Sequence, residues 1–236
     1  MSLLNIVAIE SSLRRVQEEF ESINQRLSGQ RDLMDDTVIE NLLAGYGYVD
    51  ILVEWGIDVF AMGNHKYLLE LNNIVLCGPD RELRSQYAKH IAATQNRFYE
   101  KLGGGIEDLV EWYAGHSRWT VWRLAAGLYV RMLSKPELFI EGNHRTGVLL
   151  ASYLLLRAGK PPFVLSVENA AAYFDPSSLI QNISKNGLIG LFRLPVISKR
   201  FARFLEDQAD FSYLCATNPQ KITRSLCLEE IPNAPL

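Results

Sequence analysis

The sequence has little cysteine, no long basic cluster and no apolar run long enough to span a membrane. Its three cysteines, Cys77, Cys215 and Cys227, lack the spacing of metal ligands, so we expect small reduced thiols and not a disulfide framework. The formal net charge of −3 argues against a dedicated surface for nucleic acid or for acidic membranes. The first residues lack a basic start, and their apolar stretch is too short for a signal peptide or a membrane span. These absences predict a cytoplasmic protein with neither nucleic acid nor membrane as a partner.

The composition is that of an ordinary globular protein. Hydrophobic residues make up 48% of the chain and charged residues 22%, which excludes a largely disordered protein. With 236 residues the chain is long enough for one large domain, or for one domain with an appendage. The apolar pattern divides it into an N-terminal helix over 1–30, a helical domain over 31–210 and a C-terminal tail over 211–236.

The N-terminal part shows the apolar spacing of an amphipathic helix. Apolar residues recur at alternating spacings of four and three, which places them on one face of a helix, and Ser-Gly at 28–29 ends the pattern. This face packs either within the fold or against a second copy, so a homodimer is one of two open alternatives. The residues concerned are Ile9, Leu13, Val16, Phe20, Ile23 and Leu27.

Most of the remaining chain also has helical periodicity. Nothing alternates as strand, helix and strand, so the fold class that we predict is all-α. The weak pattern over 80–103 indicates loop or hairpin in part, and 163–165 is a candidate short strand. The predicted helices cover 38–59, 66–75, 106–113, 119–133, 143–158, 177–186 and 197–205.

The strongest chemical signal is the segment 139–147, Phe-Ile-Glu-Gly-Asn-His-Arg-Thr-Gly. Gly142 and Asn143 precede a long apolar run, so they open a helix whose first turn carries free N–H groups and the positive end of the helix dipole. Such a helix start is an anion site. Arg145 adds a guanidinium that can hold phosphate oxygens at two points, and Glu141 is a hard oxygen ligand for Mg²⁺ on a phosphate.

In this segment the chain resembles the signature of the Fic/Doc proteins, His-Pro-Phe-x-Asp/Glu-Gly-Asn-Gly-Arg-x-x-Arg. When the chain is aligned on the phenylalanine, it departs from the signature at three functional positions. Glu137 stands in place of the histidine, His144 in place of a glycine and Val148 in place of the second arginine. The resemblance covers roughly residues 60–160. The matching residues are Phe139, Glu141, Gly142, Asn143 and Arg145.

The resemblance implies a fold and a set of ligands. The fold is a Fic-like helical bundle around a buried central helix, with a small β-hairpin flap at 95–99 that docks a target peptide by β-augmentation. The ligands are ATP, as substrate, and Mg²⁺, which Glu141 would hold. The nucleotide-binding residues are Gly142, Asn143, His144 and Arg145.

The resemblance also implies the catalytic role of position 137. In active members the motif histidine takes a proton from a target hydroxyl, which then attacks a nucleotide phosphate. Glu137 is therefore the candidate catalytic residue, but a carboxylate of unperturbed pKa is a poor base at neutral pH. The alternative is a surface glutamate in a lapsed active site. His144 leaves a further alternative, because Doc-like members carry a larger residue there and transfer a terminal phosphate.

Residues 36–41 resemble the inhibitory pattern of the family, Ser/Thr-x-x-x-Glu-Gly/Asn, with Asp36 in place of Ser or Thr. The pattern makes Glu40 the candidate regulatory residue. Its usual partner is the second motif arginine, which is Val148 here, so we expect Glu40 to lie near Arg145 and to compete with phosphate for it.

Two classes of function follow. The first is a Fic-like protein modifier that transfers AMP from ATP to a hydroxyl of an unidentified target protein, with weak or altered activity. The second is an inactive Fic-fold module that binds nucleotide or a partner protein.

Overall fold

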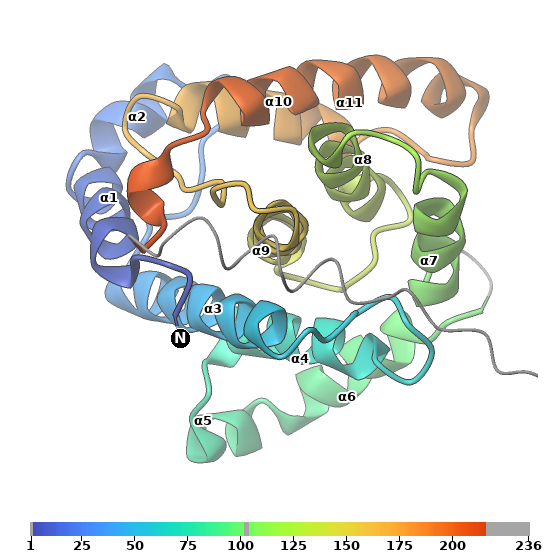
Figure 1. The fold of residues 1–236 in the computed structure, drawn as a ribbon, viewed down its shortest axis with the longest axis horizontal. Coiled ribbons are helices and arrows are strands. Elements are labelled where there is room, and N and C mark those ends of the chain that lie inside the picture. Colours follow the sequence, from blue (N-terminus) through green and yellow to red (C-terminus); the bar gives the residue numbers. More distant parts are fainter. Residues whose placement is uncertain (1, 102–103, 216–236) are drawn as a thin grey trace, which may run out of the picture.

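The computed structural model describes residues 2–101 and 104–215, and it confirms the all-α class. Within these ranges the chain forms helices joined by loops, and β-structure is limited to isolated bridges (Figure 1). The elements are α1 Ile6–Glu18, α2 Phe20–Arg26, α3 Asp36–Glu54, α4 His65–Cys77, α5 Arg81–Gln86, α6 Ala88–Phe98, α7 Ile106–Gly115, α8 Val121–Leu133, α9 Asn143–Arg157, α10 Ala170–Ile180, α11 Leu188–Asp207 and the 3-10 turn η1 Phe211–Tyr213.

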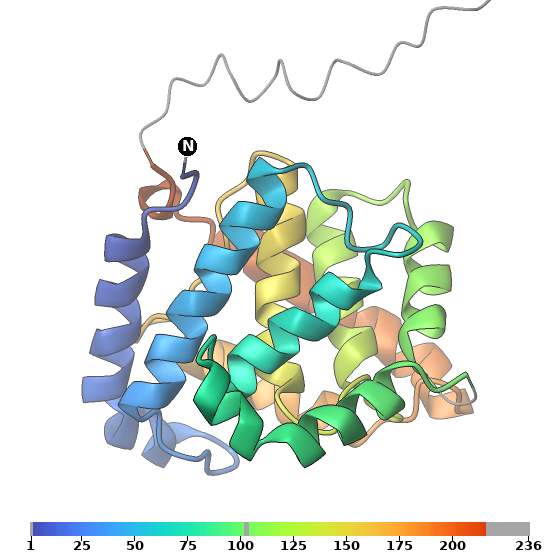
Figure 2. The ribbon, with the colours of Figure 1, turned by 90° about the horizontal axis from the view of Figure 1, so that it is seen from below.

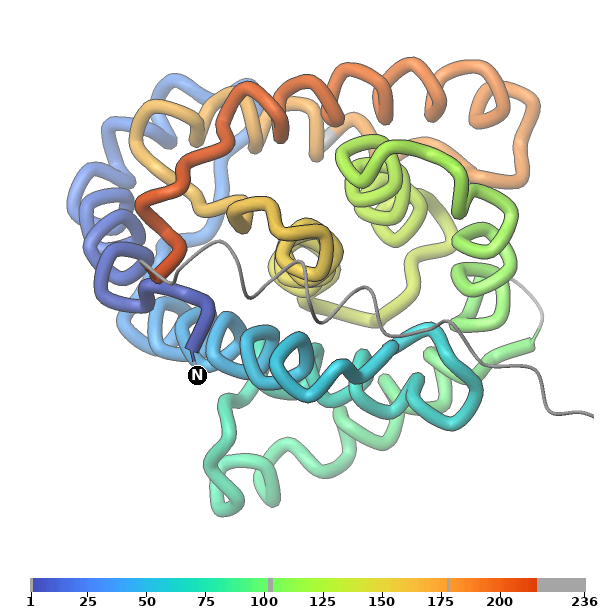
Figure 3. The backbone as a smooth tube through the Cα atoms, in the orientation of Figure 1, coloured from blue at the N-terminus to red at the C-terminus, as the bar shows by residue number. Residues whose placement is uncertain are grey.

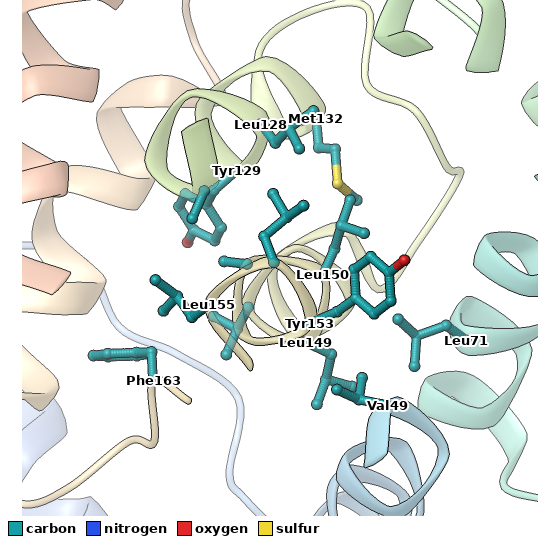
Figure 4. Close-up of a cluster of buried hydrophobic side chains, with 14 of the residues drawn as sticks. Val49, Leu71, Leu128, Tyr129, Met132, Leu149, Leu150, Tyr153, Leu155 and Phe163 are labelled. Carbon is teal, nitrogen blue, oxygen red and sulfur yellow. The ribbon is translucent and has the colours of Figure 1, made fainter. Parts of the chain in front are cut away.

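Helix α9 lies in the middle of the molecule, with the other helices around it (Figure 1). Every residue from Thr146 to Leu156 is buried, as expected for a helix that is apolar on all sides. Figure 4 shows Leu149, Leu150 and Leu155 of α9 among side chains from the surrounding helices. The prediction of a buried helix after the motif loop is thus confirmed.

Helix α9 packs chiefly against α8, α3 and α4, and Figure 2 shows α3, α9 and α8 side by side. Two glycines allow these helices to approach closely. A Cβ atom at Gly147 would lie 2.9 Å from Cδ2 of Tyr129 on α8, and one at Gly45 on α3 would collide with Cδ1 of Leu149. Both contacts are shorter than packed carbon atoms tolerate.

The N-terminal segment packs inside the fold. The predicted apolar face is buried from Ile9 to Ile23, and the helix is interrupted at Glu19. The intramolecular alternative is therefore the one observed. The two ends of the described chain lie side by side (Figure 3), because the amide of Asn5 donates to the carbonyl of Tyr213 at 2.8 Å and the amide of Cys215 to that of Leu3 at 2.9 Å.

Both predictions of β-structure are wrong. Residues 95–98, which were predicted to form part of a hairpin flap, belong to α6. Thr94 and Phe98 of this helix are both buried, and their spacing of four places them on the same side. Residues 163–165 form no strand. The carbonyl of Phe163 accepts instead from the Tyr46 hydroxyl at 2.7 Å and from Ser152 Oγ at 3.2 Å, so side chains satisfy the backbone there.

The predicted limits of the last two helices are also wrong. Helix α10 begins at Ala170, before the predicted start at 177, and carries Pro176 in its interior. Helix α11 begins at Leu188, well before 197, and carries Pro195.

None of the helices in the described ranges is both long enough and apolar enough to span a lipid bilayer. Most of the predicted tail over 211–236 lies outside those ranges.

We expect Leu155→Ala to lower the free energy of unfolding by about 2–5 kcal/mol, because the side chain is fully buried in α9 and its loss leaves a cavity. Denaturant titration followed by circular dichroism measures this change. Leu188→Ala, at a side chain that is 77% exposed, is the matched control. Equal effects of the two substitutions would contradict the central position of α9.

Candidate functional site

The side chain of Asn143 holds the motif loop closed. Its Oδ1 accepts from the amide of Phe139 at 3.0 Å, and its Nδ2 donates to the carbonyl of Phe139 and to Oε2 of Glu137, both at 2.8 Å. Asn143 is only 4% exposed. Its side chain therefore fixes the loop at the start of α9, and with both amide hydrogens engaged it has no N–H left for a phosphate.

Gly142 occupies the N-cap position of α9 in a left-handed conformation, with φ of 74°. A Cβ atom there would lie 3.0 Å from Nδ2 of Asn72 on α4. Because the cap is a glycine, no side chain bonds the first-turn amides of α9. These amides lie at the positive end of the helix dipole, an arrangement that favours an anion, and anion binding there stays a prediction.

Asn72 joins the motif loop to α4, and the motif pattern alone does not reveal it. The side chain is fully buried, and its Nδ2 donates to the carbonyl of Glu141 at 3.0 Å and to Oγ1 of Thr146 at 2.9 Å. The available signal was the Asn72–Asn73 pair inside an apolar helix, since buried amides in such helices generally have specific partners.

The carboxyl group of Glu137 lies beside Asn143, half-buried at the start of the site. Burial raises the pKa of Glu137 above its ordinary value, and the nearby charges of Lys135, Arg97 and Lys185 oppose this shift. Arg97 of α6 also donates to the carbonyl of Glu137. A raised pKa brings a carboxylate closer to what general-base catalysis at neutral pH requires.

His144 is largely enclosed by the fold. Its Nδ1 lies 3.2 Å from the hydroxyl of Tyr129, and its Nε2 is buried without a hydrogen-bond partner in the described ranges. Burial, with the charges of Arg31 and Arg145, lowers the pKa of His144 to about 4. The imidazole is therefore neutral at physiological pH and adds no positive charge to the site.

Arg145 points from the first turn of α9 toward the end of α4, where its Nη1 donates to the carbonyl of Val75 at 3.1 Å. Burial lowers the pKa of Arg145, while the charges of Glu141 and Asp35 raise it. No carboxylate of the described chain lies within ion-pair distance of this guanidinium. A partly buried cation without a carboxylate partner favours an anionic ligand.

A cavity of about 230 Å³ lies beside this turn of α9, between α3 and α10. Val148, which replaces the second motif arginine, lines it together with His144 and Arg145. The other walls are mostly apolar and aromatic, from Leu13, Phe20, Leu33, Met34, Val38, Leu42, Tyr46, Phe163, Leu165, Tyr173 and Phe174, with Arg31 and Asp32.

The structure does not bring Glu40 to Arg145. Glu40 is exposed on α3, whereas Val38 and Leu42 of the same helix line the cavity with Arg145. Since a helix turns about 100° per residue, Glu40 lies about 200° away from either of them, on the opposite side of α3. The predicted contact is therefore absent in the described chain, and a regulatory role for Glu40 stays a prediction.

Glu141, the predicted metal ligand, is exposed at the outer edge of the loop. The described residues contain no group of three or more His, Cys, Asp or Glu side chains arranged to hold a metal ion. Glu141 is thus a single carboxylate beside the uncapped start of α9, and its role as a ligand stays a prediction.

Comparison with known proteins supports the resemblance. No family model matches the chain. The protein adenylyltransferase fic-1 of Caenorhabditis elegans is 36% identical over 72 residues, which make up 29% of this chain and 14% of that protein. Over this segment the chain is similar to a Fic protein. The aligned segment thus spans far less than two thirds of the Fic relative.

Solved Fic structures show a weaker likeness. A Fic-domain signaling protein from Bacteroides thetaiotaomicron shares 17% identity over 80% of this chain and 78% of that one, with a TM-score of 0.44. Fic-1 from C. elegans shares 17% identity over 86% of this chain and 60% of that one, with a TM-score of 0.45. Likeness at this level does not define how the helices are arranged.

We expect acid to destabilise the protein partly through His144. Its folded pKa of about 4 lies below the ordinary value of 6.5, so between these values the unfolded chain binds a proton that the folded chain does not. This contribution to stability is present above pH 6.5 and is lost as the pH falls toward 4. Thermal unfolding across this range should show a smaller loss for His144→Gln than for the wild type or for a His65→Gln control. Parallel curves for all three would contradict the assignment.

Proposed function

We propose that this chain is a Fic-like protein modifier, which transfers AMP from ATP to a hydroxyl group of a target protein with weak or altered activity. The observation that carries the proposal is the uncapped first turn of α9, with a partly buried Arg145 in it and the Glu137 carboxyl beside Asn143. Sequence similarity to a protein adenylyltransferase supports the reaction class.

The phosphate groups would lie against the first-turn amides of α9, where the helix dipole favours negative charge. Arg145 would turn from the Val75 carbonyl toward the phosphates, which are stronger partners for a guanidinium than a neutral carbonyl. Asn143 keeps its bonds to Phe139 and positions the loop.

Mg²⁺ would arrive with the nucleotide, and Glu141 is the residue that would hold it. Mg²⁺ in phosphate sites is commonly bound through one or two carboxylates together with substrate phosphates and water, and one exposed carboxylate next to the anion site fits this mode. When bound, the ion would neutralise phosphate charge during the transfer.

In the proposed reaction, the target hydroxyl gives its proton to the carboxylate of Glu137 and its oxygen attacks the α-phosphorus of ATP. A new oxygen–phosphorus bond forms, the bond to the bridging oxygen breaks, and pyrophosphate leaves. Burial of Glu137 favours this role, because a raised pKa makes the carboxylate a better proton acceptor. Its bond to Asn143 must be kept or exchanged during the step.

One observation favours the second candidate, an inactive nucleotide- or protein-binding module. Oε2 of Glu137 already accepts from Asn143 Nδ2, so the carboxylate has a structural partner and the same geometry serves to brace the loop. Nucleotide binding is common to the reaction and to one form of the module, whereas transfer belongs to the first candidate alone.

Calorimetry should detect binding of ATP with Mg²⁺, and Arg145→Ala should weaken it by about 1.5–3 kcal/mol, the value of a hydrogen bond to a charged group. Arg81→Ala, at an exposed position on α5, is the control for removing an arginine elsewhere. Failure of the wild type to bind, or equal affinity of Arg145→Ala and wild type, would remove the nucleotide site from the proposal.

We expect Glu137→His to raise transfer above the wild-type level, because an unperturbed imidazole titrates near neutral pH and is a better general base there. The measurement is labelling of the chain by ATP that carries the label on its α-phosphate, with Glu137→Gln as the control that cannot accept a proton. If nucleotide binds but neither the wild type nor Glu137→His becomes labelled, the binding module is the correct candidate.

A further inference from the structure

The end of α10 and the start of α11 expose a cluster of large apolar side chains. Helix α11 and the preceding α10 lie along one edge of the molecule (Figure 1). The side chains of the cluster are between 53% and 77% exposed. Single exposed apolar residues are common on protein surfaces, whereas a contiguous group of this kind marks an interaction site. We name this cluster the α11 face; its members are Leu179, Leu188, Ile189, Leu191, Phe192 and Val196.

The opposite side of α11 is fixed to the core. Leu194, Phe201 and Leu205 are buried at spacings of seven and four, and the helix packs against α8. Leu188 and Phe192 therefore point away from the protein, and no rotation of the helix hides them without exposing its buried side. The apolar side chains of the α11 face are a property of the folded chain.

Basic residues continue the same face toward the end of α11. Arg193, Lys199, Arg200 and Arg203 are all exposed, and none of them is in an ion pair within the described ranges. No Asp or Glu occurs from 176 to 205, although the whole chain has a net charge of −3. Basic and exposed apolar side chains thus share one face of α11.

All members of the α11 face except Leu191 line a hollow of about 960 Å³, and Arg193 and Arg200 line it as well. Guanidinium groups bind phosphate at two points. Apolar side chains that insert shallowly next to Lys and Arg are the features of helices that lie in the headgroup region of an anionic bilayer.

We propose that the α11 face docks the protein on the surface of an anionic phospholipid bilayer, with Leu188, Ile189 and Phe192 inserted and the basic residues on the lipid phosphates. A second copy of the chain fits less well, because a symmetric contact would bring the same basic side chains together without a carboxylate from this segment. The expectation that no membrane is a partner rested on the overall charge and on the lack of a long basic cluster, and neither describes basic residues that are spaced along one face of a helix.

The test is co-sedimentation of the full chain with vesicles of phosphatidylcholine alone and of phosphatidylcholine and phosphatidylserine in equal parts. We expect binding to the vesicles that contain phosphatidylserine, weakened by added salt. The double substitution Arg193→Glu with Arg200→Glu should lower partitioning about tenfold or more. Leu188→Ser with Phe192→Ser should lower it about tenfold.

Matched controls lie elsewhere on the surface. Arg81→Glu with Lys89→Glu changes the net charge equally at exposed positions of α5 and α6, and Val7→Ser removes an apolar side chain that is 78% exposed on α1. These controls should bind like the wild type, and circular dichroism should show all variants folded, since every substituted side chain is exposed.

Three outcomes would overturn the proposal. The first is equal sedimentation with both kinds of vesicle, or equal loss in the α11 and control variants. The second is a dimer in sedimentation velocity that Leu188→Ser with Phe192→Ser disperses, which would make the face a contact between copies. The third is binding to soluble poly-glutamate without binding to vesicles, which would assign the face to an acidic protein. Each readout is independent of nucleotide binding and transfer.

Discussion

The burial of α9 on all sides is the constraint on which the rest of the structure depends. A helix that is apolar around its whole circumference must be enclosed, and here α8, α3 and α4 enclose it with Gly147 and Gly45 at the closest contacts. The helix then begins in a protein-lined environment and not in open water. Its first polar groups therefore have to find partners within the fold or on a ligand.

The site follows from how those partners are shared. Two side-chain amides form the hydrogen bonds that hold the motif loop. Asn143 bonds Phe139 and Glu137, and Asn72 bonds the Glu141 carbonyl and Thr146. The first-turn amides of α9 have no side-chain cap, and the guanidinium of Arg145 has only a neutral carbonyl. Hydrogen-bond donors with positive charge or partial charge thus remain at the positive end of the helix dipole. This is the physical basis of an anion site.

The sequence predicted those parts of the fold in which burial produces a strong period. The apolar run of α9 and the face from Ile9 to Ile23 are examples. Helix α6 was missed because little more than Thr94 and Phe98 buries its inner side, and the start of α11 because exposed apolar residues obscure its amphipathic pattern. At the site, the motif predicted the loop because its residues are adjacent in the sequence. Asn72 and Tyr129 contact the site from other helices, and the spacing of residues within the motif cannot predict such contacts. The position of Glu40 was wrongly inferred because a short pattern does not say which side of α3 a residue faces.

Three of the departures from the signature bear on the charge of the site. Glu137 brings a carboxyl where the signature has histidine, Val148 removes a cation, and His144 stays neutral because burial lowers its pKa to about 4. The site is thus less positive than the signature would make it, which weakens attraction for a triphosphate. Burial also raises the pKa of Glu137, which improves the carboxylate as a proton acceptor. The strength of Glu137 as a base therefore depends on its burial, so substitutions that open the loop to water should lower its pKa and weaken it as a proton acceptor.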